Sequence, residues 1–362
     1  MDATRSLFLS LIAVLVGCGL LMVHSASVTS WPTQVEQIYL SRHAVFILLG
    51  IGVAGGCSIV PASRWRQLAP WLFLGATILL MVVLIPGVGV RVNGARRWLR
   101  VGSISLQPSE LAKVALPMLL ASQAIARREQ FGHWFHGAWP FIGPICLVGG
   151  LVLIEPDLGT AAFLMTGAAV CLFLAGWPLR YFMVSGLLAG LAVGVGVGLK
   201  PYQLQRITGF FDTWTDFNAA PYQLKQSLMT LGAGGIEGVG IGKGWQKLSF
   251  LPEANTDFVI SVVGEELGLV GTMGLVVVWL GIFVCGLRLL DRCPPQSFAS
   301  IAGKTLLVQL VLQAAINVAV VTAMVPPKGI AHPLVSYGGS NLVSSFITIG
   351  VILSLTKPET NS

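Results

Sequence analysis

The residues that could carry out chemistry gather in one polar stretch, Tyr222–Gly268, which lies between two strongly hydrophobic regions. The stretch contains many glycines, three lysines, five acidic residues and one proline. A polar loop of this length is typical of a binding or catalytic loop, or of a disordered linker. Disordered linkers contain few large apolar side chains, but four are present here: Trp245, Leu248, Phe250 and Leu251. They favour a folded, functional loop.

Asp257 is the best candidate for acid–base chemistry in this stretch. Asn255 or Thr256 can cap the helix that begins the next apolar run, so Asp257 is expected in the first turn of that helix, at the outer membrane boundary. The helix dipole there favours the ionised carboxylate, while partial burial opposes it. A carboxylate balanced between these effects can serve as a general base. A simple capping role is the alternative.

Four charged residues fall inside or at the edge of apolar runs. Glu265 and Glu266 follow Asp257 by eight and nine residues, which places them about 12 Å deeper along a helix. Glu110 and Lys113 lie three residues apart on one helix face. Because charges inside a membrane are costly, we expect all four to face other helices or a cavity. For Glu110 and Lys113, an internal ion pair or a snorkelling lysine is the alternative.

The glycine-rich segment GAGGIEGVGIGKG departs from a nucleotide-binding Walker loop. Glu237 stands at the position of the first glycine, and Gly244 replaces the Ser or Thr that follows Lys243. The glycines nevertheless permit close backbone approach, and the N–H groups of the segment could face an anion.

Two smaller clusters have structural explanations. His133 and His136 have His-x-x-His spacing, but no further ligand is near them in the sequence, so we expect a solvated cytoplasmic face rather than a metal site. Glu155 and Asp157 lie in a short connector, EPDLGT. Asp157 is expected to cap a helix that begins at Leu158, and a cavity-lining role is the alternative.

The elements that must position these residues are membrane helices. The chain has 362 residues, of which 54% are hydrophobic and only 10% charged, whereas soluble proteins carry roughly 25% charged residues. We therefore predict an all-α polytopic membrane protein, forming one domain over residues 1–362, with a large outer loop between helices 7 and 8. Ten spans are predicted, at about 7–26, 42–60, 67–86, 108–126, 140–154, 158–176, 179–199, 258–289, 302–325 and 336–356.

The distribution of basic residues predicts the topology of these spans. Eight Lys and Arg residues lie in short even-numbered connectors and two in short odd-numbered ones, which places both termini in the cytoplasm. No basic stretch outside the connectors suits nucleic acid. Two loops that are expected on the outer side, 87–107 and 200–257, are also basic, so we expect an anionic partner there. The first is predicted to turn at Asn93-Gly94 and continue extended, and the second to begin with an amphipathic segment on the membrane surface.

Four separated segments resemble the SEDS family (shape, elongation, division and sporulation): MVHSAS, VNGARRWLRVGSISLQPSELAK, GGIEGVGIGKGWQKLSFLPEANTDFVISVVGEELG and PPKGIAHPLVSYGGS. The resemblance covers nearly the whole chain. It implies a peptidoglycan glycosyltransferase that polymerises lipid II on the outer face of the cytoplasmic membrane. It also implies a class B penicillin-binding protein, a transpeptidase, as partner. The family's catalytic aspartate matches Asp257, and its basic and aromatic outer-loop residues match Arg97, Trp98 and Lys113.

Within the family, the chain is most similar to the division-type members, because Lys328 stands in PPKG where elongation-type members usually carry an uncharged residue. This implies a place at the division septum, with other membrane proteins of the division machinery. The chain departs from the family at His332, usually Leu, and at Asn341, usually Ser. Both departures bear on the substrate contacts near the outer mouth.

Joined to the chemistry of the residues, the resemblance predicts a mechanism. The 4-hydroxyl of the GlcNAc of an incoming lipid II attacks the anomeric carbon of a lipid-linked glycan, Asp257 accepts the proton, and undecaprenyl pyrophosphate leaves. Four cations are candidates to stabilise the pyrophosphate: Arg97, Lys113, Lys243 and Lys328. A divalent ion such as Mg²⁺ could share this task, although no dedicated ligand set is visible.

Three other functions stay open. In a lipid II flippase, Glu110, Lys113, Glu265 and Glu266 would line a translocation path. An elongation-type polymerase would share the chemistry but act along the side wall. A structural scaffold for division would need no catalytic residue.

Overall fold

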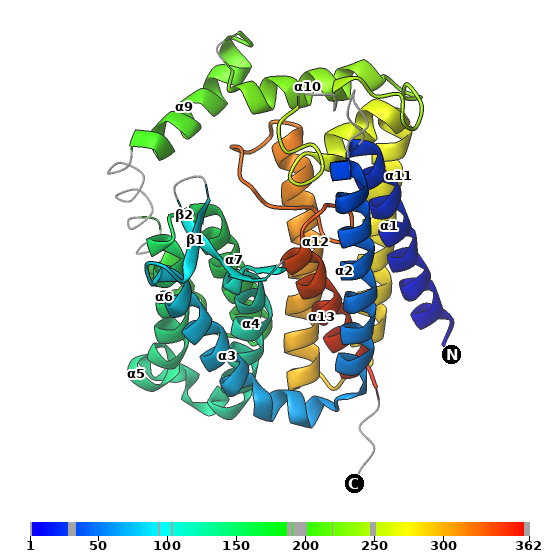
Figure 1. The fold of residues 1–362 in the computed structure, drawn as a ribbon. Coiled ribbons are helices and arrows are strands. Elements are labelled where there is room, and N and C mark those ends of the chain that lie inside the picture. The colour runs from blue at the N-terminus through cyan, green and yellow to red at the C-terminus, as the bar shows by residue number, and fades with distance from the viewer. Residues whose placement is uncertain are drawn as a thin grey trace. The chain divides into compact units, whose positions relative to one another are not determined.

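The computed structural model describes residues 2–27, 34–92, 95–102, 104–186, 190, 201–218, 220–246 and 251–357. Most of these residues are helical (Figure 1). The chain divides into two compact units. The first unit comprises Met1–Leu48, Leu187–Val284 and Val311–Gly338, and the second comprises Leu49–Gly186, Cys285–Leu310 and Gly339–Ser362. The prediction that residues 1–362 form one membrane domain stays a prediction.

In the first unit, helices α1 (Ala3–Ser27) and α11 (Val259–Leu290) lie side by side (Figure 1). Their contact is close, because a β-carbon added at Gly281 would lie 2.8 Å from Cδ1 of Leu11. Helix α11 is interrupted at Gly268, whose φ of 64° and ψ of −163° are not helical and suit glycine. This unit also contains α9 (Pro201–Thr215), α10 (Tyr222–Gly234), the start of α2 (Gln34–Ile59) and the end of α12 (Phe298–Val321).

In the second unit, α4 (Pro108–Ala126) packs against α3 (Ala62–Leu84) and α7 (Leu158–Leu174), and α6 (Trp139–Ile154) packs against α7. Most residues of α4 are buried, which explains how a helix that carries Glu110 and Lys113 is accommodated. The unit also contains a 3₁₀ turn at Arg128–Gly132, α5 (Trp134–Gly137), α13 (Gly339–Leu355) and the remaining parts of α2, α11 and α12.

A small antiparallel sheet belongs to the second unit, at one end of this bundle (Figure 1). Its strands are β1 (Gly89–Val92), β2 (Ala95–Val101) and β3 (Ile104–Leu106), in the order β1-β2-β3. Val92 pairs with Ala95, and the turn predicted between them, at Asn93-Gly94, lies outside the described residues. The extended stretch that was predicted after the turn is confirmed, and it adds a sheet to an otherwise helical fold.

The predicted spans agree well with the helices. Five helical segments are long and apolar enough to cross a membrane: Ala3–Ser27, Tyr39–Ile59, Ala62–Leu84, Val259–Leu290 and Phe298–Val321. Shorter apolar helices cover Trp139–Ile154, Leu158–Leu174 and Gly339–Leu355, and α4 covers the span predicted at 108–126. Of the span predicted at 179–199, residues 179–186 and 190 are helical, and the others lie outside the described residues. The prediction of a helical polytopic membrane protein is confirmed.

Candidate functional site

Asp257 lies in the first unit, two residues before α11 begins at Val259. The expectation that it occupies the first helical turn is therefore wrong. The backbone around it forms successive turns, in which the N–H groups of Thr256 and Phe258 both donate to the carbonyl oxygen of Glu253, at 3.1 and 3.2 Å. The Asp257 side chain is half-buried. It consequently lies at the entrance to α11, without the regular hydrogen bonds of a helix around it.

The structure places Asp257 against the connector that carries Lys328. The Asp257 carboxylate lies so close to Gly329 that a β-carbon added there would be 2.9 Å from Oδ2. Lys328, the preceding residue, is half-buried. On the other side, the N–H of Tyr337 donates to the carbonyl of Asn255 at 2.8 Å. Two segments that are about 70 residues apart in the sequence thus meet at the predicted base.

Glu265 and Glu266 are buried on α11, and both serve as hydrogen-bond acceptors within the first unit. Oε1 of Glu265 accepts the backbone N–H groups of Trp245 and Gln246, at 2.7 and 3.1 Å. The carboxylate of Glu266 accepts the hydroxyl of Ser25 on α1, with Oγ 2.7 and 2.8 Å from its two oxygens. Glu265 therefore attaches the loop before α11 to this helix, and Glu266 attaches α1 to it.

The glycine-rich segment folds back onto the interruption in α11. The N–H groups of Val239 and Gly240 donate to the carbonyl oxygens of Glu265 and Glu266, at 2.9 and 3.0 Å. In return, the N–H of Leu269 donates to the carbonyl of Gly235 at 3.0 Å. These N–H groups bind carbonyls that the break at Gly268 releases, so they do not face an anion as the sequence suggested. Lys243 is exposed, and a substrate contact for it stays a prediction.

In the second unit, Arg97 binds the connector between α6 and α7. Its Nη1 lies 3.3 Å from Oδ2 of Asp157, and its Nη2 and Nε donate to the carbonyls of Pro156 and Glu155, at 3.0 and 3.4 Å. Asp157 also accepts the N–H of Thr160 at 3.0 Å, which confirms that it caps α7. Arg97 therefore attaches the sheet to this connector. Trp98 is half-buried and pairs with Val90 across the sheet.

Glu155 is a buried carboxyl group whose unusual environment the sequence did not reveal. Its exposed fraction is 1%, and neither carboxyl oxygen has a hydrogen-bond partner among the described residues. The pKa of Glu155 is raised to about 8, mainly by burial and also by the nearby charge of Asp157, while Arg97 opposes both effects. Glu155 can therefore hold a proton at neutral pH.

Lys113 and Glu110 form a buried ion pair in the second unit, with Nζ 2.7 Å from Oε1. Lys113 also lies over the ring of Phe163, 5.1 Å from its centroid, and the hydroxyl of Ser344 on α13 donates to the carbonyl of Glu110 at 2.9 Å. The internal ion pair, which was the alternative for these two residues, is the arrangement found. Substrate contacts for Arg97, Trp98 and Lys113 stay predictions.

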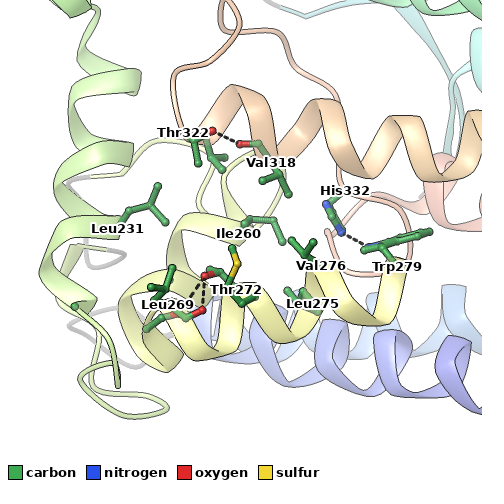
Figure 2. Close-up of a pocket in the computed structure, with 15 residues that line it drawn as sticks. Leu231, Ile260, Leu269, Thr272, Leu275, Val276, Trp279, Val318, Thr322 and His332 are labelled. Carbon is green, nitrogen blue, oxygen red and sulfur yellow. Dashed lines mark hydrogen bonds between the residues drawn. The ribbon is translucent and has the colours of Figure 1, made fainter. Parts of the chain in front are cut away.

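His332 lies in the first unit, in the same connector as Lys328, and lines an apolar cavity of about 210 Å³ (Figure 2). Its Nε2 accepts the indole N–H of Trp279 at 2.8 Å, and its backbone N–H donates to Oγ of Ser336 at 2.8 Å. Full burial lowers the pKa of His332 to about 3, so the ring is neutral. The hydroxyls of Thr272 and Thr322 in the wall bind backbone carbonyls. The family departure at His332 thus forms a packed, neutral contact.

Sequence reasoning did not identify Asn317 and Gln313, two amides on α12 that bind the Lys328 connector. Asn317 donates to the carbonyls of both Asp257 and Ile330, at 2.8 Å each. Gln313 donates to the carbonyl of Ala331 at 3.0 Å. The spacing of two amides by four residues on an apolar helix is the only signal that could have indicated a shared binding face.

The described residues contain no group of three or more His, Cys, Asp or Glu side chains that could hold a metal ion. Glu265 and Glu266 bind backbone N–H groups and a serine hydroxyl. The divalent ion stays a prediction.

Comparison with known proteins gives a consistent result. The family model for cell cycle proteins FtsW, RodA and SpoVE matches residues 5–361. Relatives named "Probable peptidoglycan glycosyltransferase FtsW" include one from Geobacter sp. (strain M18), 37% identical over 96% of this chain and 95% of the relative. Another, from Coxiella burnetii, is 40% identical over 96% of this chain and 94% of the relative.

Solved structures are similar over the same length. One, from work on "structural coordination of polymerization and crosslinking by a peptidoglycan synthase complex", superposes with a TM-score of 0.79 at 29% identity and covers 96% of each chain. Another is the rod shape determining protein RodA of Thermus thermophilus, with a TM-score of 0.69 at 28% identity, covering 96% of this chain and 95% of that one.

Proposed function

Because this chain belongs to the FtsW, RodA and SpoVE family of cell cycle proteins, we propose that it is a peptidoglycan glycosyltransferase that polymerises lipid II. The full-length similarity to proteins named peptidoglycan glycosyltransferase FtsW supports this activity. The structural observation that carries the proposal is the position of Asp257, whose half-buried carboxylate lies against Gly329, beside Lys328. A carboxylate against a segment that carries a cation suits glycosyl transfer, in which a hydroxyl oxygen loses its proton and attacks a carbon that loses a pyrophosphate.

In the proposed reaction, the 4-hydroxyl oxygen of the GlcNAc of lipid II forms a bond to the anomeric carbon of the lipid-linked glycan. The bond from that carbon to the pyrophosphate oxygen breaks, and undecaprenyl pyrophosphate leaves with the electron pair. Asp257 accepts the hydroxyl proton as general base, which contributes about 10²–10⁴-fold to the rate. The glycan is thereby lengthened by one disaccharide.

The leaving pyrophosphate needs positive charge, and Lys328 is a candidate because it directly precedes Gly329, the residue against which the Asp257 carboxylate lies. A compact ammonium suits a point contact with a phosphate oxygen, and partial burial strengthens the attraction. Lys243, Arg97 and Lys113 are further candidates, of which the last two already bind acidic groups. A divalent ion such as Mg²⁺ would neutralise the pyrophosphate when bound.

The setting of this reaction is part of the proposal. The FtsW names of the relatives support action in cell division, and so a place in the cytoplasmic membrane at the septum. The distribution of basic residues among the connectors supports the placement of both termini in the cytoplasm. The similar chain from a peptidoglycan synthase complex supports a crosslinking partner, a class B penicillin-binding protein. Other membrane proteins of the division machinery would complete the assembly, whereas elongation-type activity would place a fluorescent fusion along the side wall.

The buried charges favour an enzyme over a lipid II flippase. A translocation path would use polar groups that can face the passing headgroup. Glu265, Glu266, Glu110 and Lys113 instead bind neighbouring protein groups within 3.1 Å. The function is tested with purified protein, its transpeptidase partner and labelled lipid II in liposomes. Polymer that forms with wild type and disappears with Asp257→Ala supports the proposal, whereas flipping of lipid II without any polymer contradicts it.

A further inference from the structure

Asn317 joins the two segments that meet at the candidate active site. It lies on α12 in the first unit, with an exposed fraction of 1%. Its Nδ2 donates one hydrogen bond to the carbonyl of Asp257 and another to the carbonyl of Ile330, both at 2.8 Å. One amide nitrogen therefore fixes the backbone of the proposed base and the backbone of the Lys328 connector to the same point.

The orientation of this amide follows from its partners. Both partners are carbonyl oxygens, which can only accept, so the NH₂ side must face them and uses both of its hydrogens. Oδ1 then lies on the other side, where it is buried without a hydrogen-bond partner among the described residues. A buried acceptor without a partner lowers stability. The amide thus keeps two specific hydrogen bonds through Nδ2, although Oδ1 remains buried without a partner among the described residues. This arrangement points to a role beyond packing.

We propose that Asn317 is a positioning residue that sets the distance between the Asp257 carboxylate and the Lys328 connector. This inference rests on the proposed function, because it concerns the geometry of that reaction. Asp257 precedes α11, and its carbonyl accepts a hydrogen bond from Asn317 on α12. Loss of Asn317 would remove the bonds that hold the Asp257 carbonyl and the Ile330 carbonyl to one point, and so would loosen the turn relative to the connector.

The contact at Gly329 shows how small the tolerance is. The Asp257 carboxylate already lies where a β-carbon at 329 would be only 2.9 Å from Oδ2. Gly329 stands between Lys328 and Ile330 in the chain, and Asn317 binds the carbonyl of Ile330. A shift of the connector therefore changes the separation of base and cation directly. Misplacement of catalytic groups by about 1 Å can reduce turnover by about 10²-fold.

Gln313 provides a matched control on the same helix. It lies one turn before Asn317, is similarly buried, and donates a hydrogen bond from Nε2 to the carbonyl of Ala331 at 3.0 Å. It binds the connector at Ala331, whereas Asn317 donates the hydrogen bond to the Asp257 carbonyl. Comparison of Asn317→Leu with Gln313→Leu therefore separates loss of a connector bond from loss of the bond between connector and base.

The experiment measures lipid II polymerisation by the full-length chain with its transpeptidase partner. We expect Asn317→Leu to lower kcat by about 10–100-fold with KM within about twofold, because the groups that bind the substrate remain. Gln313→Leu should lower kcat less than Asn317→Leu does, because it removes one connector bond and leaves both bonds of Asn317 in place. Asn317→Gln keeps an amide that is one methylene longer, and it should recover part of the lost kcat.

Thermal unfolding, measured beside kcat and KM, keeps the outcomes distinct. Thermal unfolding of each variant in detergent shows whether it is folded, and Asn317→Gln replaces Asn317→Leu if the latter is not. Equal kcat values for Asn317→Leu and Gln313→Leu would overturn the positioning role, and so would a loss confined to KM. A wild-type chain that makes no polymer would instead contradict the proposed function itself.

Discussion

Asp257 and Asp157 both stand just before a helix, yet the protein uses them differently. Asp157 uses its side chain locally, since it caps α7 through Thr160 and pairs with Arg97. Asp257 is held through its backbone carbonyl by Asn317, and its carboxylate lies against a distant connector at Gly329. The same residue type in the same sequence context is thus a structural cap in the second unit and a candidate base in the first. What separates them is the group that binds the side chain.

The largest expected effect tests the contrast between Asp257 and Asp157 directly. Asp257→Asn should lower polymerisation by about 10²–10⁴-fold, because the amide cannot accept the proton. Asp157→Ala should retain most turnover but lower the free energy of unfolding by about 1 kcal/mol, the usual contribution of a helix cap. Labelled lipid II assays and thermal unfolding of both variants provide the measurement. Similar losses of turnover in both variants would show that the two aspartates do not differ as inferred.

The next effect concerns Lys328, the cation in the connector against which the Asp257 carboxylate lies. Lys328→Ala should fold and lower turnover by about 10–100-fold, less than a fully buried donor would, because the side chain is only half-buried. Lys328→Arg should retain partial activity. The control is Lys304→Ala, because Lys304 pairs with Asp291 at 2.7 Å in a partly exposed ion pair of the second unit and such pairs contribute little. If Lys328→Ala turned over lipid II like wild type, Lys328 would be an interfacial anchor.

A smaller effect is expected when the carboxylate is pushed aside without any change of charge. Gly329→Ala places a methyl group 2.9 Å from Oδ2 of Asp257, and the end of a flexible side chain can move away. We therefore expect little change in stability but about a tenfold loss of kcat, since the base is displaced by a fraction of an ångström. Gly143→Ala on α6 is the control, because no atom lies within 4 Å of the added carbon. Equal kcat in both variants would argue against a tightly set carboxylate.

The same comparison shows what the sequence could reveal. The spans were predictable because a membrane requires long apolar runs whose backbone bonds are satisfied internally. The cap at Asp157 was predictable because its partner is three residues away. The contact between Asn317 and Asp257 joins residues 60 positions apart, and nothing in the local pattern encodes it. The sequence likewise did not reveal that Glu265 accepts the N–H groups of Trp245 and Gln246. These bonds depend on how the loop folds back at the interruption of α11 at Gly268.

The smallest expected effect on turnover comes from Glu155, an acidic residue whose pKa differs from its ordinary value. Its ordinary pKa of 4.5 rises to about 8 in the folded chain, mainly because burial disfavours the charged form. Between these two values the folded chain holds a proton that the unfolded chain has released. The free energy of unfolding should therefore fall as the pH rises from about 4.5 to about 8, and should level off above that.

Glu155→Gln tests this linkage, because the amide is neutral at every pH and keeps the shape of the side chain. We expect its Tm to change less than that of wild type between about pH 5 and pH 8, and its advantage over wild type to be greatest at the alkaline end. Polymerisation at neutral pH should be nearly unchanged, since the neutral amide matches the protonated carboxyl group that the folded chain holds there. A variant whose Tm followed the same pH curve as wild type would show that Glu155 is ionised in the folded chain. A loss of turnover as large as that of Asp257→Asn would move the acid–base chemistry to the second unit.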